Sequence, residues 1–176
     1  QRFGTTRAIT HIVGKHILHG EWERAALAFI ARASMYENPR SREARQRLYE
    51  NQNYQEALNY FPQKLVYERQ MLKHLAVRRQ DFCGAFHRLP TKLCQLFVQA
   101  YQSYLFNRFL SQRMIHELPL MKARVGEYSL TINGKERLAL PLIGYRQGTT
   151  GGQQGEIEKS ILEEEGITLE QFKIQD

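Results

Sequence analysis

Apolar side chains recur at spacings of three and four residues through the first 117 residues of this 176-residue chain. Such a spacing places them along one face of an α-helix. Turn-forming residues interrupt the pattern, most clearly at Gly20, at Asn38-Pro39 and at Pro62. The pattern therefore predicts six helices, over residues 5–19, 21–35, 41–51, 54–61, 65–79 and 90–117. Several helices of this length, joined by short polar turns, are typical of a helical bundle.

The spacing changes after the last of these helices. Residues 128–132 and 135–142 alternate between apolar and polar side chains, and Asn133-Gly134 stands between the two runs. Asn-Gly tolerates the positive φ angles of a tight turn, so this pattern predicts a β-hairpin near residues 126–143. A short helix over residues 156–165 and a final turn capped by Thr168 are expected to follow. The predicted fold class is α+β, mostly helical with a small antiparallel sheet.

The chain is basic, with 25 Lys and Arg against 18 Asp and Glu, a net charge of +7 and a pI of about 9.5. This balance is typical of a nucleic-acid-binding protein. Because the two signs are mixed along the chain, a solubilising surface explains the charge equally well. No stretch approaches the roughly 18 apolar residues of a membrane span, and no secretory segment is visible, so we expect a cytoplasmic protein without a membrane partner.

Few residues could serve a metal or an aspartate-dependent active site. Cys83 and Cys94 form no Cys-x-x-Cys pair, which excludes a zinc ribbon, and the histidines near the start of the chain lack a neighbouring acidic or thiolate ligand. We therefore expect no metal site. The chain has only two aspartates, Asp81 and Asp176, beside sixteen glutamates.

Several phrases carry a resemblance to a known family. In chain order they are Gln1-Arg2-Phe3-Gly4 leading to Thr10-His11-x-Val13-Gly14, then Leu89-Pro90-x-Lys92-Leu93, then Tyr101-Gln102-Ser103-x-Leu105-Phe106-Asn107-x-x-Leu110-Ser111-x-Arg113, then Val125-Gly126-Glu127 and the stretch 140–145. Together they resemble the TruD family of tRNA pseudouridine synthases over nearly the whole chain. The third phrase, over residues 101–113, is long, and its order of residues is unusual. Residues 35–85 carry no motif of the family.

The resemblance implies a cofactor-independent enzyme that isomerises one uridine of tRNA, expected to be the thirteenth position, in the D stem. It also implies a catalytic core with a mixed sheet, a family-specific helical domain inserted into that core, and RNA bound in the cleft between them. Residues 1–20 would be the tail of the core's active-site motif leading into a helix. Residues 21–176 would be the inserted domain.

The family's nucleophilic aspartate belongs to a Gly-x-Lys-Asp phrase before the Gln-Arg-Phe-Gly motif. Neither Asp81 nor Asp176 stands in such a phrase, so the resemblance implies no catalytic residue in this chain and a nucleophile upstream of Gln1. The chain is then an internal piece of a longer enzyme, inactive without the remaining catalytic segments of the same polypeptide. The alternative is a stand-alone, non-catalytic RNA-binding or adaptor protein built on the same helical domain.

The resemblance assigns the active-site motif to Gln1, Arg2, Phe3 and Gly4. Arg2 presents a permanently charged, planar fork that suits a phosphate or holds an active-site loop. Phe3 is expected to anchor that loop in the core, and Gly4 to serve its conformation.

Five further residues are candidates for binding RNA or lining the cleft: Arg7, Lys15, Ser103, Asn107 and Arg113. The three cations are expected to contact phosphate, which adds salt dependence without sequence information. Ser103 and Asn107 are four residues apart and share one helix face. Two interpretations of this pair stay open, namely hydrogen bonds between helices or domains and a position facing the RNA cleft.

Overall fold

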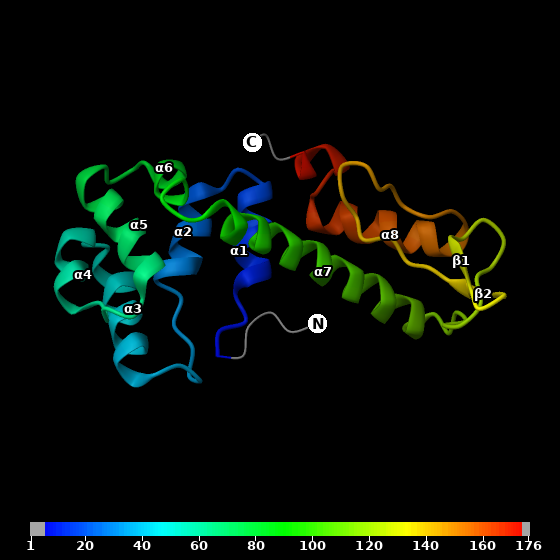
Figure 1. Cartoon of the computed structure of the whole chain (residues 1–176), viewed down its shortest axis with the longest axis horizontal. Helices are drawn as coiled ribbons and strands as arrows, with labels where there is room; N and C mark the ends of the chain where they lie inside the picture. Colours follow the sequence, from blue (N-terminus) through cyan, green and yellow to red (C-terminus); the bar gives the residue numbers. More distant parts are fainter. Residues whose placement is uncertain (1–5, 174–176) are drawn as a thin grey trace. The chain divides into compact units, whose positions relative to one another are not determined.

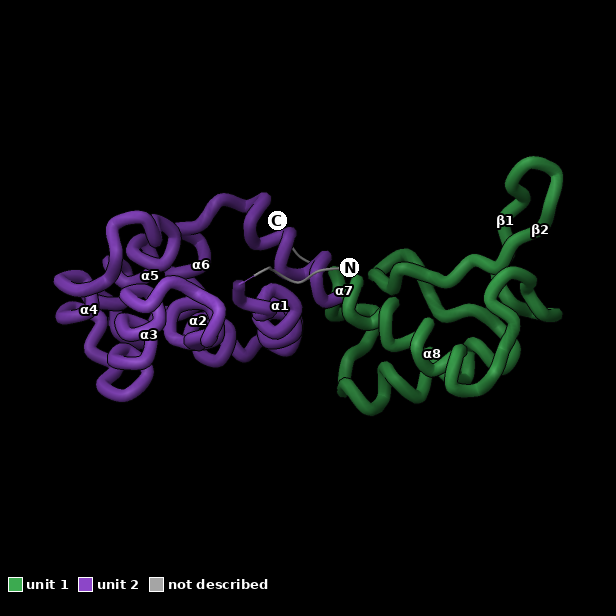
Figure 2. The backbone as a smooth tube through the Cα atoms, turned by 90° about the horizontal axis from the view of Figure 1, so that it is seen from below, with its two compact units in different colours: residues 1, 102–176 green, residues 2–101 purple. Residues whose placement is uncertain are grey.

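A computed structural model describes residues 6–173, which form two compact units, 6–101 and 102–173 (Figure 2). Helices dominate both units, and the second carries one two-stranded antiparallel sheet. This confirms the α+β fold class. The expected division between a core tail (1–20) and an inserted domain (21–176) concerns a longer protein and stays a prediction, separate from these two units.

The first unit is built from helices alone (Figure 1). They are α1 (Thr10–Leu18), α2 (Trp22–Ile30), α3 (Pro39–Asn51), α4 (Tyr54–Tyr60), α5 (Val66–Val77), α6 (Phe82–Phe86) and the first part of α7 (Thr91–Ile115). All six predicted helices are present, most with shorter ends. The five-residue helix α6 was not predicted.

Helix α2 lies at the centre of this unit, in contact with α1, α5 and α6. Its residues Ala25, Ala26 and Ile30 are fully buried. The Phe29 ring meets the Phe97 ring of α7 edge to face, with the ring centroids 5.3 Å apart, an arrangement that aromatic pairs favour. The core of the first unit therefore forms around one short helix whose small residues let its neighbours approach closely.

Close packing of α1 against α7 explains why a glycine stands at position 14, in the Thr10-His11-x-Val13-Gly14 phrase of the sequence. A Cβ atom built on Gly14 would lie 2.0 Å from the backbone oxygen of Phe97, far inside a normal contact. The backbones of α1 and α7 can therefore approach this closely only because residue 14 has no side chain.

The second unit contains the rest of α7, strands β1 (Ser129–Ile132) and β2 (Lys135–Leu138), α8 (Gly152–Glu165) and the 3-10 turn η1 (Leu169–Phe172). Asn133 and Gly134 join the strands with φ angles of 51° and 72°, which confirms the predicted hairpin. Thr168 and Gln171 form a reciprocal capping box at η1, as expected for Thr168. Helix α8 begins four residues earlier than predicted.

Across residues 6–173, no helix combines the length and the apolarity needed to cross a membrane. In the same range, no group of three or more His, Cys, Asp or Glu side chains is arranged to hold a metal ion.

Candidate functional site

The predicted active-site motif, Gln1 to Gly4, lies outside the described residues, but Arg7 shows how the chain continues from it. Arg7 Nη2 donates to the backbone oxygens of Phe29, at 2.6 Å, and Ala28, at 3.3 Å, in the last turn of α2. Its Nη1 lies 3.5 Å from Glu68 Oε1, and its side chain is 10% exposed. Arg7 is thus committed to the protein interior, and the expectation that it contacts phosphate is wrong in this structure.

Arg7 belongs to a buried ion cluster formed with Glu37, Arg45 and Glu68. The Arg45 side chain is 2% exposed, and its Nη2 and Nε donate to Glu68 Oε1 at 2.6 Å and Glu37 Oε2 at 3.0 Å. Its Nη1 donates to the backbone oxygens of Phe29 and Ile30. Two arginines therefore satisfy the carbonyl groups that a helix leaves unpaired at its C-terminus, where the helix dipole also favours cations.

Burial and the neighbouring Arg45 lower the pKa of Arg7 to about 10, so the Arg7 guanidinium is still charged at neutral pH. Glu37 and Glu68 bring two carboxylates to these two cations. The cluster ties the segment that follows the predicted active-site motif to α2, α3 and α5. Its role is to position that segment within the first unit.

Arg113 is the centre of a second buried network. Its Nη1 and Nη2 donate to Glu127 Oε1 at 2.9 Å and Oε2 at 3.0 Å, and both side chains are 0% exposed. Its Nε and Nη2 donate to the backbone oxygen of Pro119, and its Nη1 also donates to Gln154 Oε1. Arg113 has no access to solvent, so the expectation that it reaches phosphate is also corrected.

The network continues from Gln154 to Glu158. Gln154 Nε2 donates to Glu158 Oε1 at 3.0 Å, and Glu158 Oε2 accepts the backbone N–H of Thr150 at 2.7 Å. Burial raises the pKa of Glu158, although these two hydrogen bonds act in the opposite direction. The network joins two of the resemblance phrases, since Arg113 ends one and Glu127 ends another.

The remaining candidates lie on helices with partly exposed side chains. Ser103 and Asn107 are half-buried on one face of α7, and within the described part of the chain their side chains form no hydrogen bond. The opposite side of the same phrase is structural, because Tyr101 and Leu105 are fully buried and Gln102 Nε2 donates to the backbone oxygen of Ile143 at 2.7 Å. Ser103 and Asn107 therefore remain candidates, as does half-buried Lys15 on α1.

Asp81 has a structural role. Its Oδ1 accepts the Gly84 N–H at 2.9 Å and so caps the short helix α6, while Oδ2 lies 2.8 Å from His74 Nε2. The hydrogen bond from Gly84, followed by that from His74, lowers the pKa of the Asp81 carboxyl. The sequence signal for this cap was an Asp three residues before Gly84, which is weak because the helix is so short.

The net positive charge belongs to the first unit. Residues 1–101 contain 16 Lys and Arg against 8 Asp and Glu, whereas residues 102–176 contain 9 against 10. Charges of both signs are mixed along the sequence, but the excess of positive charge falls in one unit. A polyanion would be attracted to the first unit rather than to the second.

Comparison with known proteins identifies relatives of this chain. The family model for tRNA pseudouridine synthase D (TruD) matches residues 1–136. A probable tRNA pseudouridine synthase D of Methanopyrus kandleri is 45% identical over 175 residues, covering 99% of this chain and 43% of that protein. A probable tRNA pseudouridine synthase D 1 of Methanocaldococcus jannaschii is 39% identical over 174 residues, covering 99% of this chain and 42% of that protein.

The fold agrees with a solved structure. The crystal structure of the putative tRNA pseudouridine synthase D (TruD) from Methanosarcina mazei matches with a TM-score of 0.88 and 33% identity, covering 99% of this chain and 46% of that one. The chain thus spans less than half the length of each of these relatives.

Proposed function

Since the chain belongs to the TruD family of tRNA pseudouridine synthases, we propose that it is part of an enzyme that isomerises a specific uridine of tRNA to pseudouridine. The observation that carries this proposal is the 45% identity to a probable tRNA pseudouridine synthase D along 175 residues of this chain. In the reaction, the glycosidic bond from C1′ to N1 breaks and a bond from C1′ to C5 forms. The C5 proton is lost and N1 gains one, so the atoms balance without an oxidant or reductant.

We further propose that this chain supplies RNA-binding surface and part of the active-site wall. The buried ion cluster around Arg7 and Arg45 supports this role, because it fixes the segment directly after the Gln1–Gly4 motif. The excess of cations in residues 1–101 supports contact with a polyanion. Ser103 and Asn107 supply two polar groups on α7 that the described fold does not use.

The nucleophile is proposed to lie in the remaining part of a longer polypeptide. No Gly-x-Lys-Asp phrase occurs in this sequence, and Asp81 is engaged as a helix cap. We therefore expect the chain by itself to bind RNA without isomerising uridine.

The test is pseudouridine formation by the purified full polypeptide on an unmodified tRNA transcript. We expect one uridine, in the D stem, to be converted, and an Asp→Asn change in the Gly-x-Lys-Asp phrase to abolish conversion. If the full polypeptide converts no uridine in any tRNA, the enzyme proposal is wrong. Retention of salt-sensitive tRNA binding in that case would favour the non-catalytic adaptor.

A further inference from the structure

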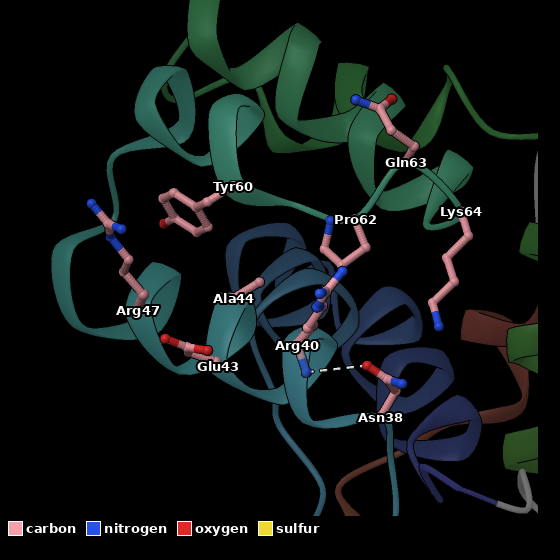
Figure 3. A pocket seen from close by; sticks show the side chains of 9 residues that line it. All are labelled: Asn38, Arg40, Glu43, Ala44, Arg47, Tyr60, Pro62, Gln63 and Lys64. Carbon is pink, nitrogen blue, oxygen red and sulfur yellow. Dashed lines mark hydrogen bonds between the residues drawn. The ribbon is translucent and has the colours of Figure 1, made fainter.

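An open groove of about 650 Å³ lies on the first unit, between α3 and the turn that joins α4 to α5 (Figure 3). Helix α3 contributes Arg40 and Arg47 to it, and the other wall contributes Tyr60, Gln63 and Lys64. The groove thus gathers three cations and an aromatic ring from two segments separated in sequence. All of these residues fall in the part of the chain that carries no family motif.

Two of the cations have no partner of their own. The side chains of Arg40 and Lys64 are exposed and form no hydrogen bond or ion pair with any residue between 6 and 173. Figure 3 shows both side chains extending into the space between α3 and the turn. An exposed cation without an internal partner is free to bind an anion without breaking an existing contact.

The third cation, Arg47, packs against the aromatic ring of Tyr60. The guanidinium carbon of Arg47 lies 4.3 Å from the centroid of the Tyr60 ring, within the range of a cation–π contact. Arg47 also pairs with Glu56, which holds the guanidinium in place. One acid, Glu43, lines the groove beside these three cations, so the lining keeps an excess of positive charge.

We propose that this groove binds the sugar-phosphate backbone of the RNA substrate, a step that rests on the proposed function. Arg40 and Lys64 neutralise phosphates and release counterions, while Arg47, held against the Tyr60 ring, adds a third positive charge to the same groove. A flexible Lys and an exposed Arg on an open surface suit phosphate rather than the edges of particular bases. The groove therefore contributes affinity for RNA, with little preference for sequence.

The experiment compares the full polypeptide with its Arg40→Gln/Lys64→Gln variant. The dissociation constant for a labelled tRNA transcript is measured between about 0.05 and 0.3 M salt. We expect a rise in Kd of about fivefold to tenfold for each cation near 0.1 M salt, and a loss of about one unit of salt slope for each. The lost affinity should also appear as a higher KM for tRNA in pseudouridine formation, and the Kd for an unrelated RNA of equal length should rise by a similar factor.

Two controls keep the result specific. Lys159→Gln removes one exposed cation from α8 and should leave Kd unchanged. The charge-conserving variant Arg40→Lys/Lys64→Arg should bind like the unchanged protein, which separates lost charge from lost folding. If the Gln variant keeps the original Kd and salt slope while pseudouridine still forms, the groove proposal is wrong and the proposed function stands. If binding falls as expected but the full polypeptide forms no pseudouridine, the proposed function fails and the groove remains an RNA site.

Discussion

Arg113 and Glu127 face each other with two parallel hydrogen bonds, of 2.9 and 3.0 Å, and solvent reaches neither side chain. Moving two charges out of water has a large cost, so such a pair adds little net stability as a unit. Each of the two residues therefore depends on the other, because either one alone would be a buried charge without a partner of opposite sign. The start of the β-hairpin region is thereby coupled to α7.

Arg113→Met should be strongly destabilising. It leaves the Glu127 carboxylate buried without its partner, and we expect a loss of about 3–5 kcal/mol in the free energy of unfolding. The measurement is urea denaturation followed by circular dichroism. Arg146→Gln, at an exposed position, is the matched control and should change the value by less than about 0.5 kcal/mol. Equal effects of the two substitutions would contradict the account of Arg113.

Glu127→Gln should change how stability depends on pH. Burial opposes ionisation of Glu127, but the hydrogen bonds from Arg113 and the Arg124 N–H outweigh it, so the pKa of Glu127 lies below its ordinary value. A lowered pKa gives stability that is present above the unfolded value of about 4.3 and is lost as pH falls through the folded value.

The variant lacks this titration. Its free energy of unfolding should therefore be lower than that of the unchanged protein at pH 7, and the two curves should converge as pH falls below the unfolded value and through the lower folded value. Denaturant titrations at a series of pH values provide the test. A constant difference between the curves over this range would show that the Glu127 charge is not responsible.

Arg45 and Glu68 should behave as a coupled pair. Arg45→Leu leaves Glu68 with the longer 3.5 Å contact to Arg7 as its remaining ion pair among the described residues, and we expect a loss of about 3–5 kcal/mol. Combining it with Glu68→Leu should cost less than the sum of the two single changes, by about 1–3 kcal/mol. Chemical denaturation of the four proteins gives this coupling energy, and strict additivity would rule it out.

Gly14→Ala should separate α1 from α7. The added Cβ would meet backbone rather than a flexible side chain, at 2.0 Å from the Phe97 oxygen, and we expect a loss of about 3 kcal/mol or more. At Gly148, the nearest atom to an added Cβ is 4.0 Å away, so Gly148→Ala serves as the control and should be tolerated. Thermal unfolding of both variants decides the question, and similar melting temperatures would contradict the close approach of the two helices.

The helices and the hairpin were predictable because their signals are local. Apolar spacing marks six helices, α1 to α5 and α7, and Asn133-Gly134 marks the turn by its own backbone preferences. Helix ends were less predictable. Helix α3 begins at Pro39 with Asn38 as its cap, earlier than Ser41, and α8 begins in a Gly- and Gln-rich stretch because its Gln154 is buried in the Arg113 network.

The roles of the arginines were not predictable from local sequence. Arg7 and Arg113 look like phosphate ligands along the chain, yet both are held by carboxylates distant in sequence, Glu68 and Glu127. The Arg40 side chain, in contrast, forms no hydrogen bond or ion pair with the described residues, and it lines a groove completed by Lys64. Tertiary contacts decide which arginine side chain is left without a partner inside the protein. Neither the net charge of the chain nor the spacing of its residues reveals those contacts.

The central claim, that this chain is part of a tRNA pseudouridine synthase, is tested most directly by mapping pseudouridine at each position of tRNA from cells with and without the gene. The account predicts that one uridine, in the D stem, loses its modification on deletion. The modification should return when the gene is restored. An unchanged pseudouridine map in the deletion strain would contradict it.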